Sequence, residues 1–123
     1  MKNFTIDFVA KGGSPEEWQL VLVEEGDWSF VDRRLHQLQD RLYDCIDAVL
    51  DGQLAEKYPD SMVKNVIIQV EFFDAPEDKV SPFIERFAED IFSVGDYAEA
   101  LRGCRFAKSI SVTASFGRLP RSK

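Results

Sequence analysis

The sequence has few residues of the kinds that carry chemistry: 123 residues include two cysteines and one histidine. Cys45 and Cys104 lie far apart without a neighbouring cysteine or histidine, so the spacing of a zinc site or a redox motif is missing. Two cysteines do not make a disulfide framework, and we expect a buried free thiol at Cys45 in a reducing compartment. No nucleophile is predicted beside His36, so the sequence indicates no catalytic residue.

Long hydrophobic runs are also missing. No stretch approaches the roughly 18 apolar residues of a membrane span, and the first eight residues alternate where a signal peptide would be continuously apolar. We therefore expect a cytoplasmic protein without a membrane partner. Gly12-Gly13-Ser14 follows a predicted strand but lacks the Lys-Ser/Thr and the glycine spacing of a phosphate loop, so we predict no cofactor.

Acidic residues are absent from the end of the chain and abundant before it. Residues 1–101 contain all 22 acids and nine bases, a balance of −13, whereas residues 102–123 contain six bases and no acid. Because phosphate attraction dominates nucleic-acid binding, the acidic body disfavours nucleic acid as the main ligand. We predict one domain over residues 1–117 and a flexible basic tail over residues 118–123.

The hydrophobic pattern predicts four strands, over residues 4–10, 18–23, 66–73 and 105–116. A long helix is predicted from Ser29 to Asp51, with Asp27 or Ser29 as its N-cap and Gly52 as its end. A second helix is predicted to begin at Ser81–Pro82 and to end at Gly95, and residues 96–101 leave room for a short third one.

The element order β-β-α-β-α-β predicts the α+β class and a two-layer sandwich. We expect a four-stranded, mainly antiparallel sheet, in which the first two strands pair antiparallel and both helices cover one face. The other face should meet water, because it would carry Thr5, Asp7, Gln69, Glu71 and the Ser/Thr row of the last strand.

The aspartate stripe, which consists of Asp40, Asp44, Asp47 and Asp51, follows one line of the predicted long helix, opposite its apolar face. At about 100° per residue, the four side chains fall within roughly 60° of each other. Aspartate is a poor helix former, like charges at this spacing repel, and anions near a helix C-terminus are disfavoured, which together cost about 2–3 kcal/mol. A cost of this size indicates a surface that binds a cationic partner.

Other residues extend this predicted surface. Tyr43 should point to the same exposed side and resembles an interface anchor, since tyrosine is enriched at binding hot spots. The predicted partner-binding residues are therefore Asp40, Tyr43, Asp44, Asp47, Asp51, Glu24, Glu25 and Asp27. Carboxylates along a rigid helix are too far apart to enclose a metal ion, so we predict no metal site. The alternative is a solvated helix face, with Tyr43 covered by the connection after Gly52.

In its size, its isoelectric point near 4.7, its single α/β domain and its carboxylate-rich helix face, the chain resembles the small acidic cytoplasmic immunity proteins of bacterial toxin–immunity pairs, including those of contact-dependent inhibition systems. This resemblance implies a non-enzymatic inhibitor that blocks a basic toxin domain, such as a nuclease, by covering its substrate site. The basic C-terminal end departs from a uniformly acidic inhibitor and argues against simple mimicry of nucleic acid.

Two other functions remain open. The protein could be a self-associating structural module, in which the first or last strand pairs with a second copy or the basic end docks on another molecule's acidic helix; otherwise we expect a monomer or a weak homodimer. It could also be a small enzyme without a recognisable motif. In that case His36 would act with Asp40, because a carboxylate four residues away on a helix can hold an imidazole in one tautomer.

Overall fold

The computed structural model describes residues 8–11, 15–25, 27–93 and 95–117, the first of these as backbone. The elements follow in the order β1 (Phe8–Lys11), β2 (Glu17–Glu24), α1 (Val31–Leu50), α2 (Gln53–Lys57), the 3-10 helix η1 (Pro59–Ser61), β3 (Lys64–Phe73), α3 (Glu77–Asp90), α4 (Asp96–Arg102) and β4 (Ala107–Gly117). The predicted tail at 118–123, the turn at 12–14, and Thr5 and Asp7 lie outside the described residues.

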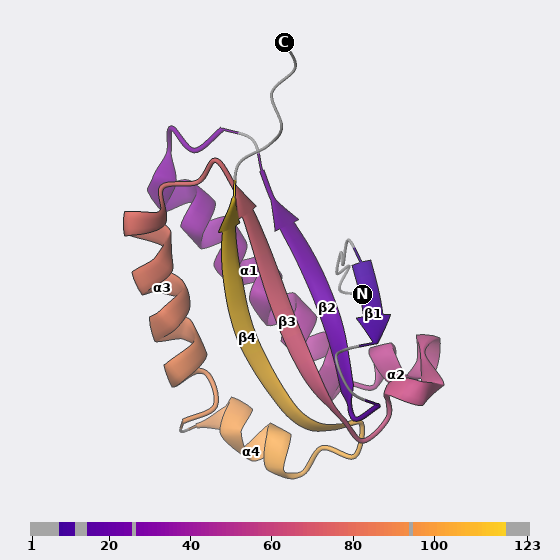
Figure 1. Cartoon of the computed structure of the whole chain (residues 1–123). Helices are drawn as coiled ribbons and strands as arrows, with labels where there is room; N and C mark the ends of the chain where they lie inside the picture. The colour runs from indigo at the N-terminus through magenta and orange to yellow at the C-terminus, as the bar shows by residue number, and fades with distance from the viewer. Residues whose placement is uncertain (1–7, 12–14, 26, 94, 118–123) are drawn as a thin grey trace.

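The strands form one sheet in the order β1-β2-β3-β4, and its three long strands run parallel. Among the described strands β1 alone is antiparallel, and it is a four-residue edge strand beside β2. The predicted mainly antiparallel sheet is therefore wrong. The reason is that α1, and then α3 with α4, return the chain to the starting end of the sheet, so each next strand runs in the same direction (Figure 1).

The prediction of two helices is also wrong, because the described chain contains four α-helices. The short α2 occupies part of the segment predicted as a polar connection, and α4 fills the space left for a short helix. The long helices α1 and α3 lie on the same side of the sheet (Figure 1). Within the described chain, none of the helices combines the length and the apolar character that a bilayer crossing requires.

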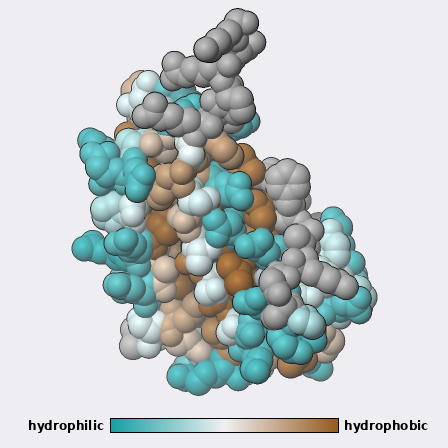
Figure 2. Space-filling model, viewed as in Figure 1, coloured by the Kyte–Doolittle hydropathy of each residue, from teal (hydrophilic) through white to brown (hydrophobic). Residues whose placement is uncertain are grey.

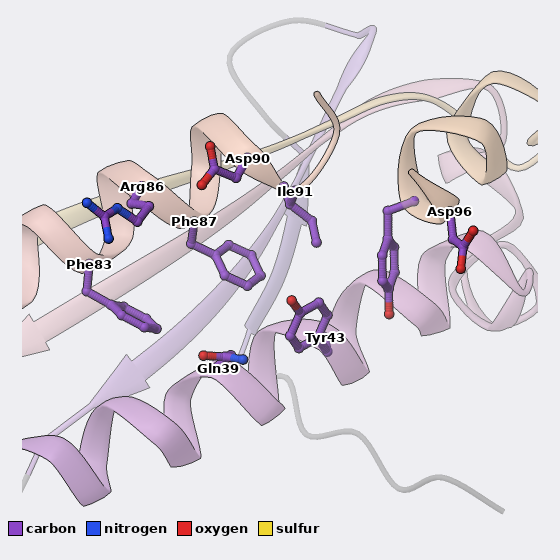
Figure 3. A pocket seen from close by; sticks show the side chains of 9 residues that line it. Gln39, Tyr43, Phe83, Arg86, Phe87, Asp90, Ile91 and Asp96 are labelled. Carbon is purple, nitrogen blue, oxygen red and sulfur yellow. The ribbon is translucent and has the colours of Figure 1, made fainter. Parts of the chain in front are cut away.

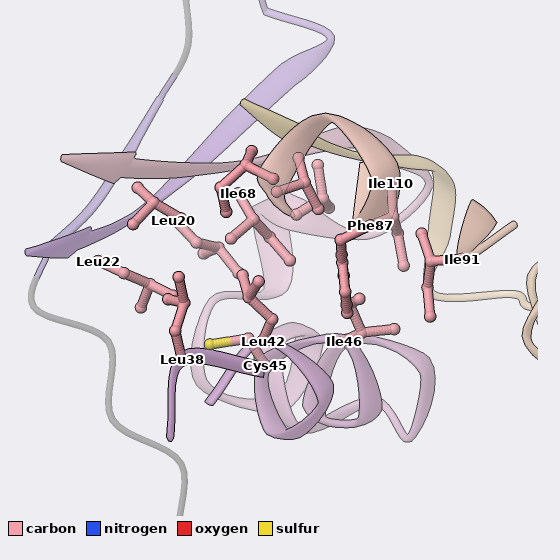
Figure 4. Close-up of a cluster of buried hydrophobic side chains, with 14 of the residues drawn as sticks. Leu20, Leu22, Leu38, Leu42, Cys45, Ile46, Ile68, Phe87, Ile91 and Ile110 are labelled. Carbon is pink, nitrogen blue, oxygen red and sulfur yellow. The ribbon is translucent and has the colours of Figure 1, made fainter. Parts of the chain in front are cut away.

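The core lies between the sheet and these two long helices. Alternate residues of the three parallel strands point toward α1 and α3, and the chief buried side chains are Leu20, Leu22, Val66, Ile68, Val70, Phe72, Ile110, Leu38, Leu42, Ile46, Ile84, Phe87 and Ile91 (Figure 4). Each contributes about 1.5–3 kcal/mol by leaving water. Cys45 is buried among them, as predicted.

None of the helices of the described chain covers the opposite face of the sheet (Figure 1). Its side chains are half-buried or exposed, and polar residues of β3 and β4 bond to each other across it: Thr113 donates to Gln69, and Ser109 donates to Asn65 at 2.7 Å. Figure 2 views this face and shows hydrophilic and hydrophobic residues intermixed.

The prediction for α1 is correct at its C-terminal end and wrong at its N-terminal end. The predicted N-caps are wrong: Phe30 occupies that position without a side-chain hydrogen bond, because Asp27 accepts hydrogen bonds from Ser29 instead. The predicted end is confirmed, since Gly52 has a φ of +88° just after Asp51, the C-cap residue. A side chain at Gly52 would also come within 2.8 Å of the Phe106 ring.

Helix α3 begins at Glu77, four residues before the predicted Ser81–Pro82 start. The Pro76 carbonyl accepts the first two hydrogen bonds, from the amides of Lys79 and Val80. Glu77 stands in the first turn, where the helix dipole favours an acid. Pro82 is tolerated because it is exposed and stands close to the N-terminus of the helix, so only one helical hydrogen bond is lost.

Candidate partner-binding surface

The structure places the whole aspartate stripe on α1 or at its C-cap. Asp40 and Asp51 are exposed, while Asp44 and Asp47 are half-buried. Within the described part of the chain, no lysine or arginine forms an ion pair with Asp44 or Asp51. Helix α1 also has no basic residue in its last turn, so its C-terminal half presents an acidic surface.

Tyr43 does not project freely from this surface. Its ring is half-buried and packs edge-on against Phe87 of α3, with the ring centroids 5.3 Å apart, and against Tyr97 of α4 at 5.4 Å. The covering elements are α3 and α4, and not the connection after Gly52. Tyr43 thus belongs to an aromatic cluster, which Phe83 extends by a stacked contact with Phe87 at 6.5 Å.

Asp47 joins the stripe to this cluster. The Tyr97 hydroxyl donates a hydrogen bond to the Asp47 carboxylate at 2.8 Å, across fifty positions of the sequence. Burial raises the pKa of the Tyr97 phenol, and the hydrogen bond to Asp47 raises it further, as does the negative charge of Asp44. Tyr97 therefore stays neutral at physiological pH and fixes the position of α4 against α1.

A groove of about 350 Å³ lies where α1, α3 and α4 meet. Its size is at the lower end of the range of small-ligand sites, about 300–1,000 Å³. In Figure 3 the rings of Phe83 and Phe87 point from α3 toward Gln39 and Tyr43 of α1. Aromatic and acidic residues dominate the lining, which consists of Gln39, Tyr43, Phe83, Arg86, Phe87, Asp90, Ile91, Asp96 and Tyr97.

The second predicted group of acids lies near the N-terminal half of α1, and its member Glu24 is neutralised within the molecule. The Glu24 carboxylate accepts from Arg41 at 2.6 Å and from Arg34 at 3.5 Å, and the Glu24 side chain is only 12% exposed. The Arg34 guanidinium also lies over the Trp28 ring, 4.1 Å from its centroid. We call Glu24, Asp27, Trp28, Arg34 and Arg41 the paired cluster.

Asp27 and Glu25 also serve this internal network. The Asp27 carboxylate accepts from the Ser29 hydroxyl at 2.5 Å and from its amide at 2.8 Å, and these bonds lower the pKa of Asp27. The backbone carbonyls of Asp27 and Glu25 both accept hydrogen bonds from Arg34. These predicted extensions therefore differ from the aspartate stripe, since their surroundings already supply positive charge.

His36 stands outside the groove. Its side chain is 76% exposed, and its Nε2 atom is 4.0 Å from the Asp40 carboxylate, one helical turn away. The described residues contain no group of three histidine, cysteine or acidic side chains placed to hold a metal ion. The His36–Asp40 pair is thus exposed to solvent and is not enclosed as the reacting groups of an active site are.

Sequence reasoning missed the α3 and α4 side of this surface. None of the residues that α3 and α4 contribute to the groove was among the predicted partner-binding residues. The available signal was Tyr97 on a short helix between Gly95 and Gly103, an aromatic residue with a polar end that needs a hydrogen-bond partner when buried. The partner, Asp47, could not be inferred without the packing of α4 on α1.

Comparison with known proteins shows a family without an assigned activity. No curated protein and no solved structure matches the chain. A family of unknown function, DUF6572, matches residues 1–99, which extend from the N-terminus into α4. The chain therefore belongs to the family of unknown function DUF6572.

Proposed function

We propose that this protein is a non-enzymatic inhibitor of the immunity-protein kind, which binds and neutralises a cationic partner, such as a toxin nuclease domain, in the cytoplasm. The observation that carries the proposal is the juxtaposition of acidic residues with the aromatic groove. Asp44 and Asp51 lack a basic partner among the described residues, and the stripe runs beside the Tyr43–Tyr97 contact.

The two features would act at different stages of binding. Exposed carboxylates of one sign attract a basic protein over several ångströms and raise the association rate. An aromatic-lined groove then supplies the desolvated contacts that slow dissociation, since hot spots lie in well-packed pockets surrounded by polar rims. Helices α1 and α3 hold both features on rigid elements, so little conformational entropy is lost on binding.

The groove favours binding over catalysis. Its lining in the described chain contains aromatic, acidic and amide side chains and Arg86, but no histidine, serine or cysteine. A carboxylate or a tyrosine can act as a nucleophile, but Asp90 and Asp96 are exposed and are not enclosed as the reacting groups of an active site are. We therefore assign the groove to recognition.

The test replaces two acids of the stripe and measures capture of a toxin domain. The proposal predicts that the neighbouring reading frame encodes a secreted protein with a basic C-terminal domain, and this is the domain to use. The wild-type chain should restore growth of cells that express this domain, and its association rate should fall as salt rises. Asp40→Lys with Asp44→Lys should slow association at least about tenfold at low salt, because attraction becomes repulsion.

The matched control is Glu56→Lys with Asp60→Lys. These two acids are exposed on α2 and η1, away from the groove, and the control makes the same change in net charge. The proposal predicts an association rate within about twofold of wild type for this control. Equal rates for both double variants, with both folded by circular dichroism, would contradict the assigned surface.

Self-association is the second candidate function, and the position of β4 favours it. This eleven-residue strand is at an edge of the described sheet and contains no charged residue from Ser109 to Gly117. Long uncharged edges can pair with another strand. Sedimentation at two salt concentrations separates the two functions: a monomer at both supports the inhibitor, and a dimer at both supports pairing through the uncharged β4 edge.

A further inference from the structure

The groove between α1, α3 and α4 contains the components of a site for one particular side chain. We infer that it receives an arginine side chain of the cationic partner, with the guanidinium against the tyrosine rings and between the groove acids. This inference rests on the proposed function and names the chemistry that the partner must present.

The aromatic wall is built to stay in place. Tyr43 is held by Phe87 on one side and by Tyr97 on the other, and Tyr97 is tied to Asp47 by its hydroxyl. Aromatic faces attract cations within about 6 Å of the ring centroid, and arginine makes this contact more often than lysine. A wall that is already ordered requires no rearrangement when a cation arrives.

The charges around the groove select a cation. Asp90 and Asp96 line it, and Asp47 borders it through its bond to Tyr97. Arg86 is the one basic residue of the lining in the described chain, and it forms no ion pair or ring contact with the described residues. The net charge of the groove is therefore negative, which disfavours an anion. Arg86 is only a weak competitor of an incoming guanidinium for the groove acids.

In the paired cluster, an aromatic ring and a carboxylate of this same molecule already bind an arginine side chain. There the Arg34 guanidinium covers the Trp28 ring and donates to the Glu24 carboxylate and to two backbone carbonyls. The groove offers the same combination of an aromatic face and carboxylates. A planar, weakly hydrated guanidinium on an apolar stem suits it better than a compact ammonium, because the stem can lie along Phe83 and Ile91.

The experiment titrates the full-length protein with Nα-acetyl-L-arginine amide and follows backbone amide and aromatic resonances by NMR. The matched probe is Nα-acetyl-L-citrulline amide, which has nearly the same shape without the charge. Arginine amide should give saturable shifts at the rings of Tyr43, Phe87 and Tyr97. Citrulline amide should bind at least about fivefold more weakly, because it loses the cation–π and carboxylate contacts.

Three variants locate the site. Asp90→Asn should weaken binding of arginine amide about threefold, whereas Glu89→Gln, the same charge change on the neighbouring exposed residue, should leave it unchanged. Arg86→Gln should strengthen binding about threefold by removing the like charge. Equal binding of both probes, or equal effects of Asp90→Asn and Glu89→Gln, would overturn the inference.

The outcomes separate this inference from the proposed function. If arginine amide does not reach the aromatic rings while Asp40→Lys with Asp44→Lys still slows capture of the toxin domain, the arginine site is wrong and the inhibitor stands. If arginine amide saturates the rings but the wild-type chain captures no toxin domain, the site stands and the inhibitor is wrong.

Discussion

Two acidic groups lie beside the two halves of α1 and have opposite surroundings: the first stands at the end of β2 and just after it, and the second is on α1 itself and its C-cap. In the paired cluster, Glu24 is 12% exposed and is held by both Arg34 and Arg41. In the aspartate stripe, Asp44 and Asp51 have no such partner among the described residues. Acidic residues alone therefore do not mark a binding surface, and the position of the nearest guanidinium decides which carboxylates remain available.

The comparison also explains why the stripe borders a groove. Arg34 and Arg41 point from α1 back to the end of β2, where they satisfy carboxylate and carbonyl groups of the chain itself. Toward its C-terminus, α1 meets α3 and α4, whose facing residues include Phe87 and Tyr97. The first half of the helix thus stabilises the fold, and we propose that the second half recognises a partner.

The largest effect should come from breaking the paired cluster. Glu24→Gln removes the charge that two guanidinium groups share, and it should lower the free energy of unfolding by about 2 kcal/mol, because each arginine is left in a partly buried site with less compensation. Urea unfolding at neutral pH measures this loss. Glu25→Gln is the control: its side chain is exposed, so the change should stay within about 0.5 kcal/mol.

A smaller effect is expected where the stripe meets the groove. Tyr97→Phe removes the hydroxyl that donates to Asp47 and should cost about 1 kcal/mol at neutral pH, measured by urea unfolding. The pKa of Tyr97 is raised in the folded state, so the folded protein favours the protonated phenol. The stabilisation should be complete below the unfolded pKa of about 10 and should fall as the pH rises above it.

The variant and the wild type should therefore converge in stability at high pH. Their difference in unfolding free energy should be constant from about pH 6 to pH 9 and shrink above about pH 10. A difference that stayed constant through the alkaline range would show that the hydroxyl does not titrate as the Asp47 contact requires. The absorbance of ionised tyrosine gives a second measurement. In Tyr97→Phe, the tyrosine that ionises at the highest pH in the wild type should be missing from the titration.

The sequence identified the elements better than their arrangement. The long helix was predicted over 29–51 and observed over Val31–Leu50, and the Gly52 end was correct, because periodicity and a left-handed glycine are local signals. The antiparallel pairing of the first two strands was correct, but the directions of the other strands were wrong, although a helix joining two strands of one sheet already favours a parallel pair. The groove could not be foreseen, because Tyr43 meets Phe87 and Tyr97 only after α3 and α4 pack on α1.

The smallest effect should have the opposite sign. Asp51→Asn removes a negative charge from the C-cap of α1, where the helix dipole disfavours anions and no basic residue stands in the last turn. The free energy of unfolding should rise by about 0.3–0.5 kcal/mol at low salt and by less at high salt, because exposed charges are screened. A loss of stability would mean that Asp51 is held by its own molecule. A gain in stability would show that the Asp51 charge does not stabilise the fold and is available to a partner. The same removal of charge at Glu24 should instead weaken the fold.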